Sequence, residues 1–186
     1  MKIISIILLF LLTSCSTLST GDLLFHVVEQ GNAITDVTPG MIDHVAIVLT
    51  KDSVIEAVGA GVKTTPLDTL RQQEGYYMVG RVRGADARRS IDNARHLLGR
   101  PYDTLYLADN EAIYCSELVL LAMVDRHGKR LLRPVPMSFH DASGRITPYW
   151  QQFYRQHNME VPEGQPGSNP GELSQRREVR LKGRLK

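Results

Sequence analysis

The residue best suited to chemistry in this sequence is Cys115, in the run Tyr114-Cys115-Ser116-Glu117-Leu118. It stands where the polar stretch 108–112 gives way to an apolar run, Leu118 to Val124, which is typical of a helix. At a helix start, unpaired backbone N–H groups and the positive end of the helix dipole favour a thiolate over a thiol. A free cysteine can also serve as a small buried apolar residue. Cys115 is therefore a candidate nucleophile, whose role depends on the residues that accompany it.

Two residues upstream could serve this nucleophile. The β-branched runs 43–49 and 53–58 are separated by Thr50-Lys51-Asp52, which predicts an antiparallel hairpin. His44 and Glu56 are about equally far from the turn, so we expect them to be near neighbours across the strands. Glu56 could then hold the imidazole in one tautomer. A strand histidine can also be a surface or hydrogen-bonded residue, and a buried glutamate needs a partner.

Together the three side chains would support covalent acyl transfer. His44 would take the thiol proton, and the thiolate of Cys115 would attack an acyl carbon to give a thioester, which water or another acceptor resolves. The oxyanion needs donors, for which the backbone N–H of Cys115 and the hydroxyl of Tyr102 or Tyr114 are candidates. This chemistry requires neither a metal ion nor an organic cofactor, and we expect none.

The elements that must position these residues indicate an α+β domain. Gly21 to Val28 is typical of a turn and a first strand, and Tyr76 to Val82 of a strand after the hairpin. Thr65, as a cap, and Pro66 predict a short helix or turn through Gln73. Asp86 to Gly99 predicts a capped amphipathic helix, and Thr147-Pro148 a helix that ends at His157. We expect a small antiparallel sheet, carrying the acid and the base, packed against the cysteine helix.

The N-terminus has the pattern of a targeting signal. Lys2 precedes an apolar run from Ile3 to Leu12, which is shorter than the roughly 20 residues that span a bilayer. The run ends in Leu12-Thr13-Ser14-Cys15, which matches a bacterial lipobox. We expect residues 1–14 to be a signal peptide that is cleaved before Cys15, with the lipid on Cys15 and residues 15–20 as a tether. An ordinary signal peptide or an uncleaved anchor is the alternative.

Lipidation would hold the protein in the cell envelope, bound to a membrane through Cys15. Ser16, rather than an aspartate, resembles the signal for onward sorting in Gram-negative cells, so we expect the periplasmic face of the outer membrane. With Cys15 lipidated, Cys115 has no intramolecular disulfide partner. An unpaired thiol in an oxidising compartment calls for a reason, and catalysis supplies one.

Length and charge limit the remaining choices. The 186 residues suffice for one domain, which we place at 21–160. The formal net charge of +2 is too small to indicate nucleic-acid binding, and the sequence shows no zinc-ligand cluster. From Pro162 onward the chain is rich in glycine and proline and then in basic residues, which predicts that residues 161–186 are a disordered basic tail. Such a tail could be solvated or attracted to an anionic membrane or wall polymer.

The order of these motifs resembles that of a known family, the circularly permuted branch of the NlpC-like papain-fold cysteine amidases, or YiiX-like group. The likeness covers Gly21 to about Tyr154 and rests on five motifs, which are Gly21-Asp22, His44-Val45-Ala46-Ile47, Ile55-Glu56-Ala57, Gly99-Arg100-Pro101-Tyr102-Asp103 and Tyr114-Cys115-Ser116-Glu117-Leu118. In ordinary papain-like enzymes the cysteine precedes the histidine, whereas here it follows. The resemblance implies a permuted papain-like fold with Cys115 as nucleophile, His44 as base and Glu56 as orienting residue.

The same resemblance implies a hydrolase or acyl transferase that acts on amide or ester bonds in the envelope. The wider family suggests peptidoglycan stem-peptide amides as substrates. The permuted group also resembles lecithin retinol acyltransferase-like enzymes, so a lipid ester or N-acyl substrate is the second choice. A catalytically inactive, lipid-anchored protein that binds a peptide or acyl ligand is the alternative of another class. If Glu56 does not orient His44, the residues to examine are Asp43, Asp103 and His140.

Overall fold

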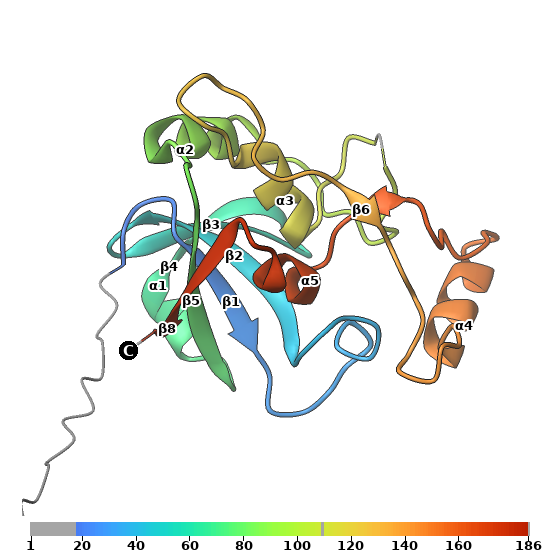
Figure 1. Ribbon diagram of the computed structural model, residues 1–186. Helices are drawn as coiled ribbons and strands as arrows, with labels where there is room; N and C mark the ends of the chain where they lie inside the picture. The colour runs from blue at the N-terminus through green and yellow to red at the C-terminus, as the bar shows by residue number, and fades with distance from the viewer. Residues whose placement is uncertain (1–17, 109, 186) are drawn as a thin grey trace, which may run out of the picture.

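A computed structural model describes residues 18–108 and 110–185. Within this part of the chain, the centre of the molecule is a six-stranded antiparallel sheet with the strand order β4-β3-β2-β1-β5-β8 (Figure 1). Its strands are β1 (Leu23–Val27), β2 (Ile42–Thr50), β3 (Ser53–Val58), β4 (Gly61–Pro66), β5 (Tyr76–Val82) and β8 (Val179–Arg184). The other elements are α1 (Leu67–Arg71), α2 (Ala87–His96), α3 (Cys115–Ala122), β6 (Val135–Pro136), α4 (Pro148–Gln156), β7 (Pro166–Gly167) and α5 (Pro170–Gln175).

The sheet has an apolar core on each face. The main core lies between the sheet and helices α2, α3 and α5. The opposite face packs against α1, whose Leu67 and Leu70 are buried. A third apolar cluster surrounds α4, where Trp150 and Tyr154 are buried together with Phe139. Among the described residues, no helix has both the length and the apolar character needed to cross a bilayer.

The hairpin predicted around His44 and Glu56 is present. β2 and β3 pair antiparallel, with Ile47 opposite Ile55. Continued by one residue, this register sets Glu56 opposite Ala46, so His44 is its diagonal neighbour across the two strands. Diagonal neighbours on a sheet are within reach of long side chains. The hairpin therefore brings the predicted base and its orienting acid together by local pairing alone.

Helix α3 begins at the cysteine and is apolar on most sides. Tyr114 is its N-cap residue, with an extended backbone and no side-chain capping bond. A helix that is apolar all round is a buried helix, and Leu118 is fully buried against the sheet. The apolar run predicted to be helical reaches Val124 and closes at His127-Gly128, but α3 ends at Ala122, because the backbone of Val124 is instead hydrogen-bonded to the start of α2.

The predicted cap of α2 and the predicted start of α4 are confirmed. The carboxylate of Asp86 accepts a hydrogen bond from the backbone N–H of Arg89 in the first turn of α2. The hydroxyl of Thr147 accepts one from the backbone N–H of Trp150, and Pro148 occupies the first turn of α4. Both contacts satisfy backbone donors that a helix start leaves unpaired.

The described N-terminal residues are part of the fold. Leu18 packs against the apolar cluster on the α1 side of the sheet, which also receives Leu185. The hydroxyl of Thr20 donates a hydrogen bond to a backbone oxygen of β2. The prediction of a free tether over 15–20 is therefore wrong for residues 18–20, because apolar packing and hydrogen bonding attach them to the sheet. The predicted signal peptide, 1–14, and Cys15 lie outside the described residues.

The prediction of a disordered tail over 161–186 is wrong for its described residues, 161–185. β8 is an edge strand that pairs antiparallel with β5, and Leu173 of α5 is fully buried in the main core. Gly171 passes so close to the backbone of Pro39 that a Cβ there would overlap its carbonyl oxygen. The glycine and proline that indicated disorder thus permit close packing and start α5. The domain extends well beyond the predicted boundary at residue 160.

Candidate active site

Cys115 is the first residue of α3 and is only 5% exposed. It forms no disulfide. As the first helical residue, its backbone N–H has no acceptor within the helix and points with the helix dipole toward the space in front of the thiol. The fold therefore places the thiol where the sequence predicts it, at a helix start that borders a pocket.

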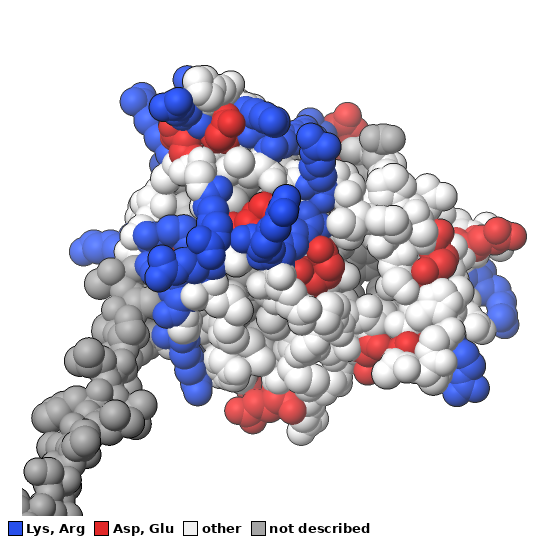
Figure 2. Space-filling view, viewed as in Figure 1, with Lys and Arg blue, Asp and Glu red and all other residues white. Residues whose placement is uncertain are grey.

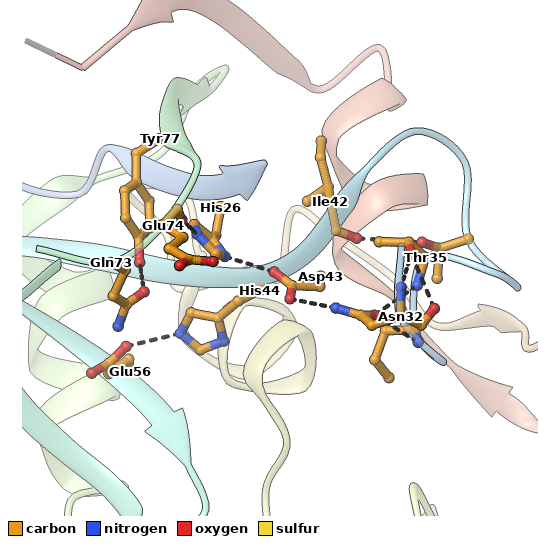
Figure 3. A network of polar contacts seen from close by, with 12 residues as sticks. His26, Asn32, Thr35, Ile42, Asp43, His44, Glu56, Gln73, Glu74 and Tyr77 are labelled. Atoms are coloured by element: carbon orange, nitrogen blue, oxygen red, sulfur yellow. Dashed lines mark hydrogen bonds and ion pairs between the residues drawn. The ribbon is translucent and has the colours of Figure 1, made fainter. Parts of the chain in front are cut away.

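The imidazole of His44 lies between the thiol and a buried carboxylate. Its Nε2 atom is 2.8 Å from Oε2 of Glu56, and the thiol of Cys115 lies close enough to the ring to affect its pKa. Figure 3 shows the contact between His44 and Glu56. Because Glu56 occupies Nε2, the nitrogen left for the thiol is Nδ1. The side chains of His44 and Glu56 are 18% and 5% exposed. The structure thus brings together the three residues that the sequence predicts as nucleophile, base and orienting acid.

The surroundings of His44 and Glu56 favour the charged form of each side chain. Burial lowers the pKa of His44, but hydrogen bonds and the negative charges of Cys115 and Glu56 outweigh it, so the pKa lies above the ordinary value of 6.5. Burial raises the pKa of Glu56, but the hydrogen bonds from His44 and Thr65 outweigh it, so this pKa lies below its ordinary value of 4.5. Glu56 is therefore anionic at neutral pH, and the site favours the imidazolium form of His44.

Thr65 is a residue whose role the sequence prediction missed. It does not cap α1, which begins after Pro66 without a side-chain capping bond. Thr65 lies in β4 opposite Val54, and its hydroxyl donates a 2.6 Å hydrogen bond to Oε1 of Glu56. Both carboxylate oxygens of Glu56 are therefore bonded. The alternation of β4 could have indicated this contact, since Thr65 is a diagonal neighbour of Glu56 across β3 and β4.

Asp43 directly precedes His44 in β2, and its carboxylate is bonded to a second histidine, His26, rather than to His44. Its Oδ1 atom lies 2.8 Å from Nδ1 of His26, and its Oδ2 accepts from the amide of Asn32 (Figure 3). The Nε2 atom of His26 lies 2.7 Å from the carbonyl oxygen of Glu74. Both neighbours of His26 are acceptors, so both ring nitrogens donate, and the hydrogen bond to Asp43 raises the pKa of His26 against the effect of burial. This imidazolium joins β1 to β2 beside His44.

Asp103 and His140 do not replace Glu56 either, because both have partners elsewhere. Asp103 is buried, and its carboxylate accepts hydrogen bonds from the backbone N–H groups of Leu105 and Leu107. His140 lies 3.2 Å from a carboxylate oxygen of Glu163. Asp103 therefore shapes the loop that follows Tyr102, and Glu56 is the carboxylate that bonds His44.

Three tyrosines gather around the thiol. Tyr102 and Tyr114, the predicted donors, line the pocket together with Cys115, and Tyr106 joins them. Burial and the nearby charge of Cys115 raise the pKa of Tyr102 above its ordinary range and that of Tyr106 to about 12, so both stay protonated at neutral pH.

Tyr106 is a site residue that no sequence pattern indicated. Its backbone is in the left-handed region, with φ 53°, which side chains other than glycine rarely adopt. The hydrogen bonds from the loop to Asp103 and from Tyr154 to the carbonyl of Leu105 hold this conformation. Its ring packs 5.2 Å from that of Tyr114 and 5.6 Å from that of Trp150, measured between centroids. The strained loop therefore presents Tyr106 to the pocket.

The pocket beside the thiol has a volume of about 60 Å³ and a largely aromatic and aliphatic lining. The apolar side chains of this lining are Ile34, Val37, Tyr102, Tyr106, Tyr114, Met137, Phe139 and Trp150. Part of one wall comes from the segment predicted to be disordered, namely Ser168, Asn169 and Pro170. The backbone N–H of Ser168 donates to the hydroxyl of Tyr114, which attaches this wall to the residue before the thiol.

Comparison with known proteins identifies the family. The family of permuted papain-like amidase enzymes, YaeF/YiiX, C92, matches residues 17–143, which is more than half of the chain. The protein YiiX of Escherichia coli (strain K12) is 31% identical over 123 residues, 60% of this chain and 60% of the relative. A crystal structure described as the metalloprotein yiiX from Escherichia coli O157:H7 has a TM-score of 0.69 at 22% identity, over 89% of this chain and 96% of that chain. The chain belongs to the family of permuted papain-like amidases.

The predicted α+β, permuted papain-like fold is confirmed by this family and by the likeness to the solved structure. Amidases are hydrolases, so the family is one of hydrolytic enzymes. The chain spans about 60% of the length of the curated relative that it matches. Among the residues that the structure describes, no group of three or more His, Cys, Asp or Glu side chains is placed to hold a metal ion.

We predict that His44→Gln removes a pH-dependent part of the free energy of unfolding. Because the folded-state pKa of His44 lies above 6.5, its protonation stabilises the fold fully below that pH, and the contribution is lost as the pH rises towards the folded-state pKa. Urea titrations should therefore show the largest difference from wild type near pH 5.5, and a smaller one near about pH 9. His157→Gln, at an exposed position, is the matched control. A difference that grows with rising pH would contradict the assignment.

Proposed function

We propose that the protein is a cysteine amidase in which Cys115 is the nucleophile, His44 the general base and Glu56 the residue that orients the base. The observation that carries this proposal is the position of His44, which lies beside the thiol of Cys115 and is bonded, at 2.8 Å, to a buried carboxylate. The three side chains come from α3, β2 and β3. A structural role alone does not require a free cysteine to meet such a pair at the edge of a pocket.

The mechanism follows from this geometry. The thiolate of Cys115 attacks the acyl carbon while His44 is protonated, and an oxyanion forms on the carbonyl oxygen. The C–N bond then breaks as His44 gives its proton to the leaving amine, which leaves a thioester on Cys115. His44 next removes a proton from water, the resulting hydroxide attacks the thioester, and the carboxylic acid leaves as the thiol reforms. Glu56 keeps the imidazole in place and stabilises its charge in both steps.

The oxyanion has two donors in this arrangement. The first is the backbone N–H of Cys115, at the start of α3. The second is a tyrosine hydroxyl, for which Tyr102 and Tyr106, both in the pocket lining with Cys115, are candidates. The oxygen of Tyr114 accepts a hydrogen bond from the N–H of Ser168, which leaves the O–H proton of Tyr114 free to donate. Tyr114 is therefore a further candidate for the tyrosine donor, and it also attaches the pocket wall.

The lining of the pocket bears on the choice of substrate. Its acyl-binding surface is aromatic and aliphatic, and its one acidic side chain, Asp43, is already bonded to His26 and Asn32. A peptidoglycan stem peptide carries charged groups that would need polar partners here. An apolar acyl group would gain from burial against this surface. We propose amides, or esters, of an apolar acyl group as the substrate class, with stem-peptide amides as the second candidate.

We also propose that Cys15 carries lipid and holds the protein at the periplasmic face of the outer membrane. The support is the lipobox Leu12-Thr13-Ser14-Cys15 at the end of a short apolar run.

Alkylation by iodoacetamide tests the thiolate–imidazolium pair. Wild-type Cys115 should be alkylated well below about pH 8.5, where a free cysteine begins to ionise, because His44 stabilises the thiolate. His44→Ala should move the profile upward, whereas His157→Ala should leave it unchanged. Mass analysis of the peptide that carries Cys115 separates its reaction from that of Cys15. Equal alkylation rates for wild type and His44→Ala from about pH 5 to 9 would contradict the thiolate–imidazolium pair of Cys115 and His44, and with it the proposed mechanism.

Hydrolysis of two nitroanilides tests the substrate class. The amide of a medium-chain fatty acid should have a kcat/KM at least about tenfold above that of the acetyl amide, because each buried methylene favours binding by about 0.8 kcal/mol. Cys115→Ser should abolish both activities. A matched stem-peptide amide that is cleaved faster than the fatty amide would instead support the second candidate.

Intact mass of membrane-extracted protein tests the lipid anchor. The mature chain should begin at Cys15 and carry the added mass of acyl chains. Cys15→Ser should release the protein from the membrane or block its processing. A soluble mature form that begins at another residue would contradict the proposal.

A further inference from the structure

The edge strand β8 and its neighbour β5 form a basic surface. β8 carries Arg180, Lys182 and Arg184 and contains no acidic residue. Figure 2 shows Lys and Arg side chains gathered over the part of the sheet where β5 and β8 lie. We call the cations of this sheet edge the β8 basic surface, which consists of Arg81, Arg83, Arg177, Arg180, Lys182 and Arg184. Arg180, opposite Arg81, and Arg184, opposite Met78, project from the two faces of the edge strand.

Carboxylates of the fold only partly neutralise this charge. Arg180 lies directly opposite Arg81 in the β5–β8 pairing, a like-charge pair that destabilises a sheet. The buried carboxylate of Asp22 is bonded to Arg81 and lies 3.8 Å from the amine of Lys182. Its single negative charge is therefore shared between two positive charges. The guanidinium of Arg184 lies 4.3 Å from the centre of an aromatic ring of β5. The surface thus keeps positive charge that an external anionic partner can neutralise.

An apolar side chain is exposed within the same strand. Leu181, between Arg180 and Lys182, is 41% exposed although it is a large hydrophobic residue. Cations beside an exposed apolar side chain are the combination found on surfaces that bind at a membrane interface. There, the apolar group enters the headgroup boundary and the cations meet anionic lipid.

The length of the chain before Leu18 decides which face of the domain meets a membrane. Leu18 packs in the same apolar cluster as Leu185, the residue that follows β8. Cys15 is only three residues earlier in the sequence, and an extended chain covers at most about 3.6 Å per residue, or about 11 Å in total. A lipid on Cys15 therefore brings the membrane to the end of the sheet where β8 lies.

We propose that the β8 basic surface lies on an anionic phospholipid membrane and orients the domain there. Its placement rests on the proposed lipid anchor, whereas its charge is a property of the folded chain. Figure 1 shows α4, which contributes Trp150 to the pocket, on the opposite side of the molecule from β8. In this orientation the pocket faces away from the membrane and receives its substrate from the aqueous side.

The test uses a chain that begins at residue 15 with Cys15→Ser, so that lipid cannot contribute. This chain keeps every residue of the apolar clusters, which start at Leu18. It should sediment with vesicles of phosphatidylglycerol and phosphatidylethanolamine but not with vesicles of phosphatidylcholine. About 0.5 M NaCl should release it, because salt screens exposed charges. Absence of binding to the anionic vesicles would overturn the proposal, whatever the result for lipidation of Cys15.

Matched double variants locate the binding surface. Arg180→Gln with Arg184→Gln should weaken binding to the anionic vesicles by about 25-fold, since each basic residue near a membrane surface contributes about fivefold. Arg88→Gln with Arg89→Gln removes the same charge from the exposed face of α2 and should change binding little. Equal losses in the two pairs would show a net-charge effect and overturn the proposal.

Two further measurements separate the remaining outcomes. Binding to purified peptidoglycan sacculi in place of vesicles would identify a wall polymer as the partner and also overturn the proposal. The alkylation profile of Cys115 should be the same in both double variants as in wild type, which shows that they fold. A failure of membrane binding with an unchanged alkylation profile would leave the proposed amidase mechanism intact.

Discussion

The candidate site depends on a carboxylate that stays ionised inside the sheet. Glu56 is nearly fully buried, and an unpaired charge there would cost several kcal/mol. Its two oxygens are bonded to His44 on β2 and to Thr65 on β4, so its environment is complete only when β2, β3 and β4 are paired in register. The charge that orients His44 is therefore maintained by the fold of three strands, and a shift of one residue in either pairing would remove it.

The C-terminal segment completes both the sheet and the pocket. α5 buries Leu173 in the main core, and β8 extends the sheet beside β5. The same segment touches the cysteine helix, where the hydroxyl of Ser168 is 3.0 Å from that of Ser116. Folding of this segment thus stabilises the surroundings of Cys115. The pocket wall that it forms is continuous with the main core, through Leu173 of α5. The basic surface of β8 arises from the same segment.

The permuted order of the chain is compatible with an intact site because geometry, and not covalent order, sets the chemistry. The strands with the base and its acid come first, and the helix with the thiol follows, but α3 packs directly on β2 and β3. The main core between them fixes how far Cys115 stands from His44. What a papain-like site needs is this packing, and either chain order can provide it.

The sequence by itself determined the features that depend on short-range patterns. The hairpin over 43–58 follows from strand alternation on both sides of a turn, and the caps Asp86 and Thr147 follow from their spacing to the first helical turn. The identity and order of Cys115, His44 and Glu56 were also readable, because each stands in a local motif.

The tertiary structure decided the rest, because it depends on contacts between residues that are distant in the sequence. Ser168 bonds Tyr114 across 54 positions, and no local composition shows that a segment rich in glycine, proline and arginine will find such partners. Thr65 had the pattern of a helix cap, but β4 continues as far as Pro66, so Thr65 lies in a strand. Its hydroxyl therefore donates a hydrogen bond to Glu56 instead of capping α1. Tyr106 reaches the pocket only through a left-handed backbone that Asp103 and Tyr154 hold in place. Burial and long-range hydrogen bonding, which the sequence does not display, assembled the site.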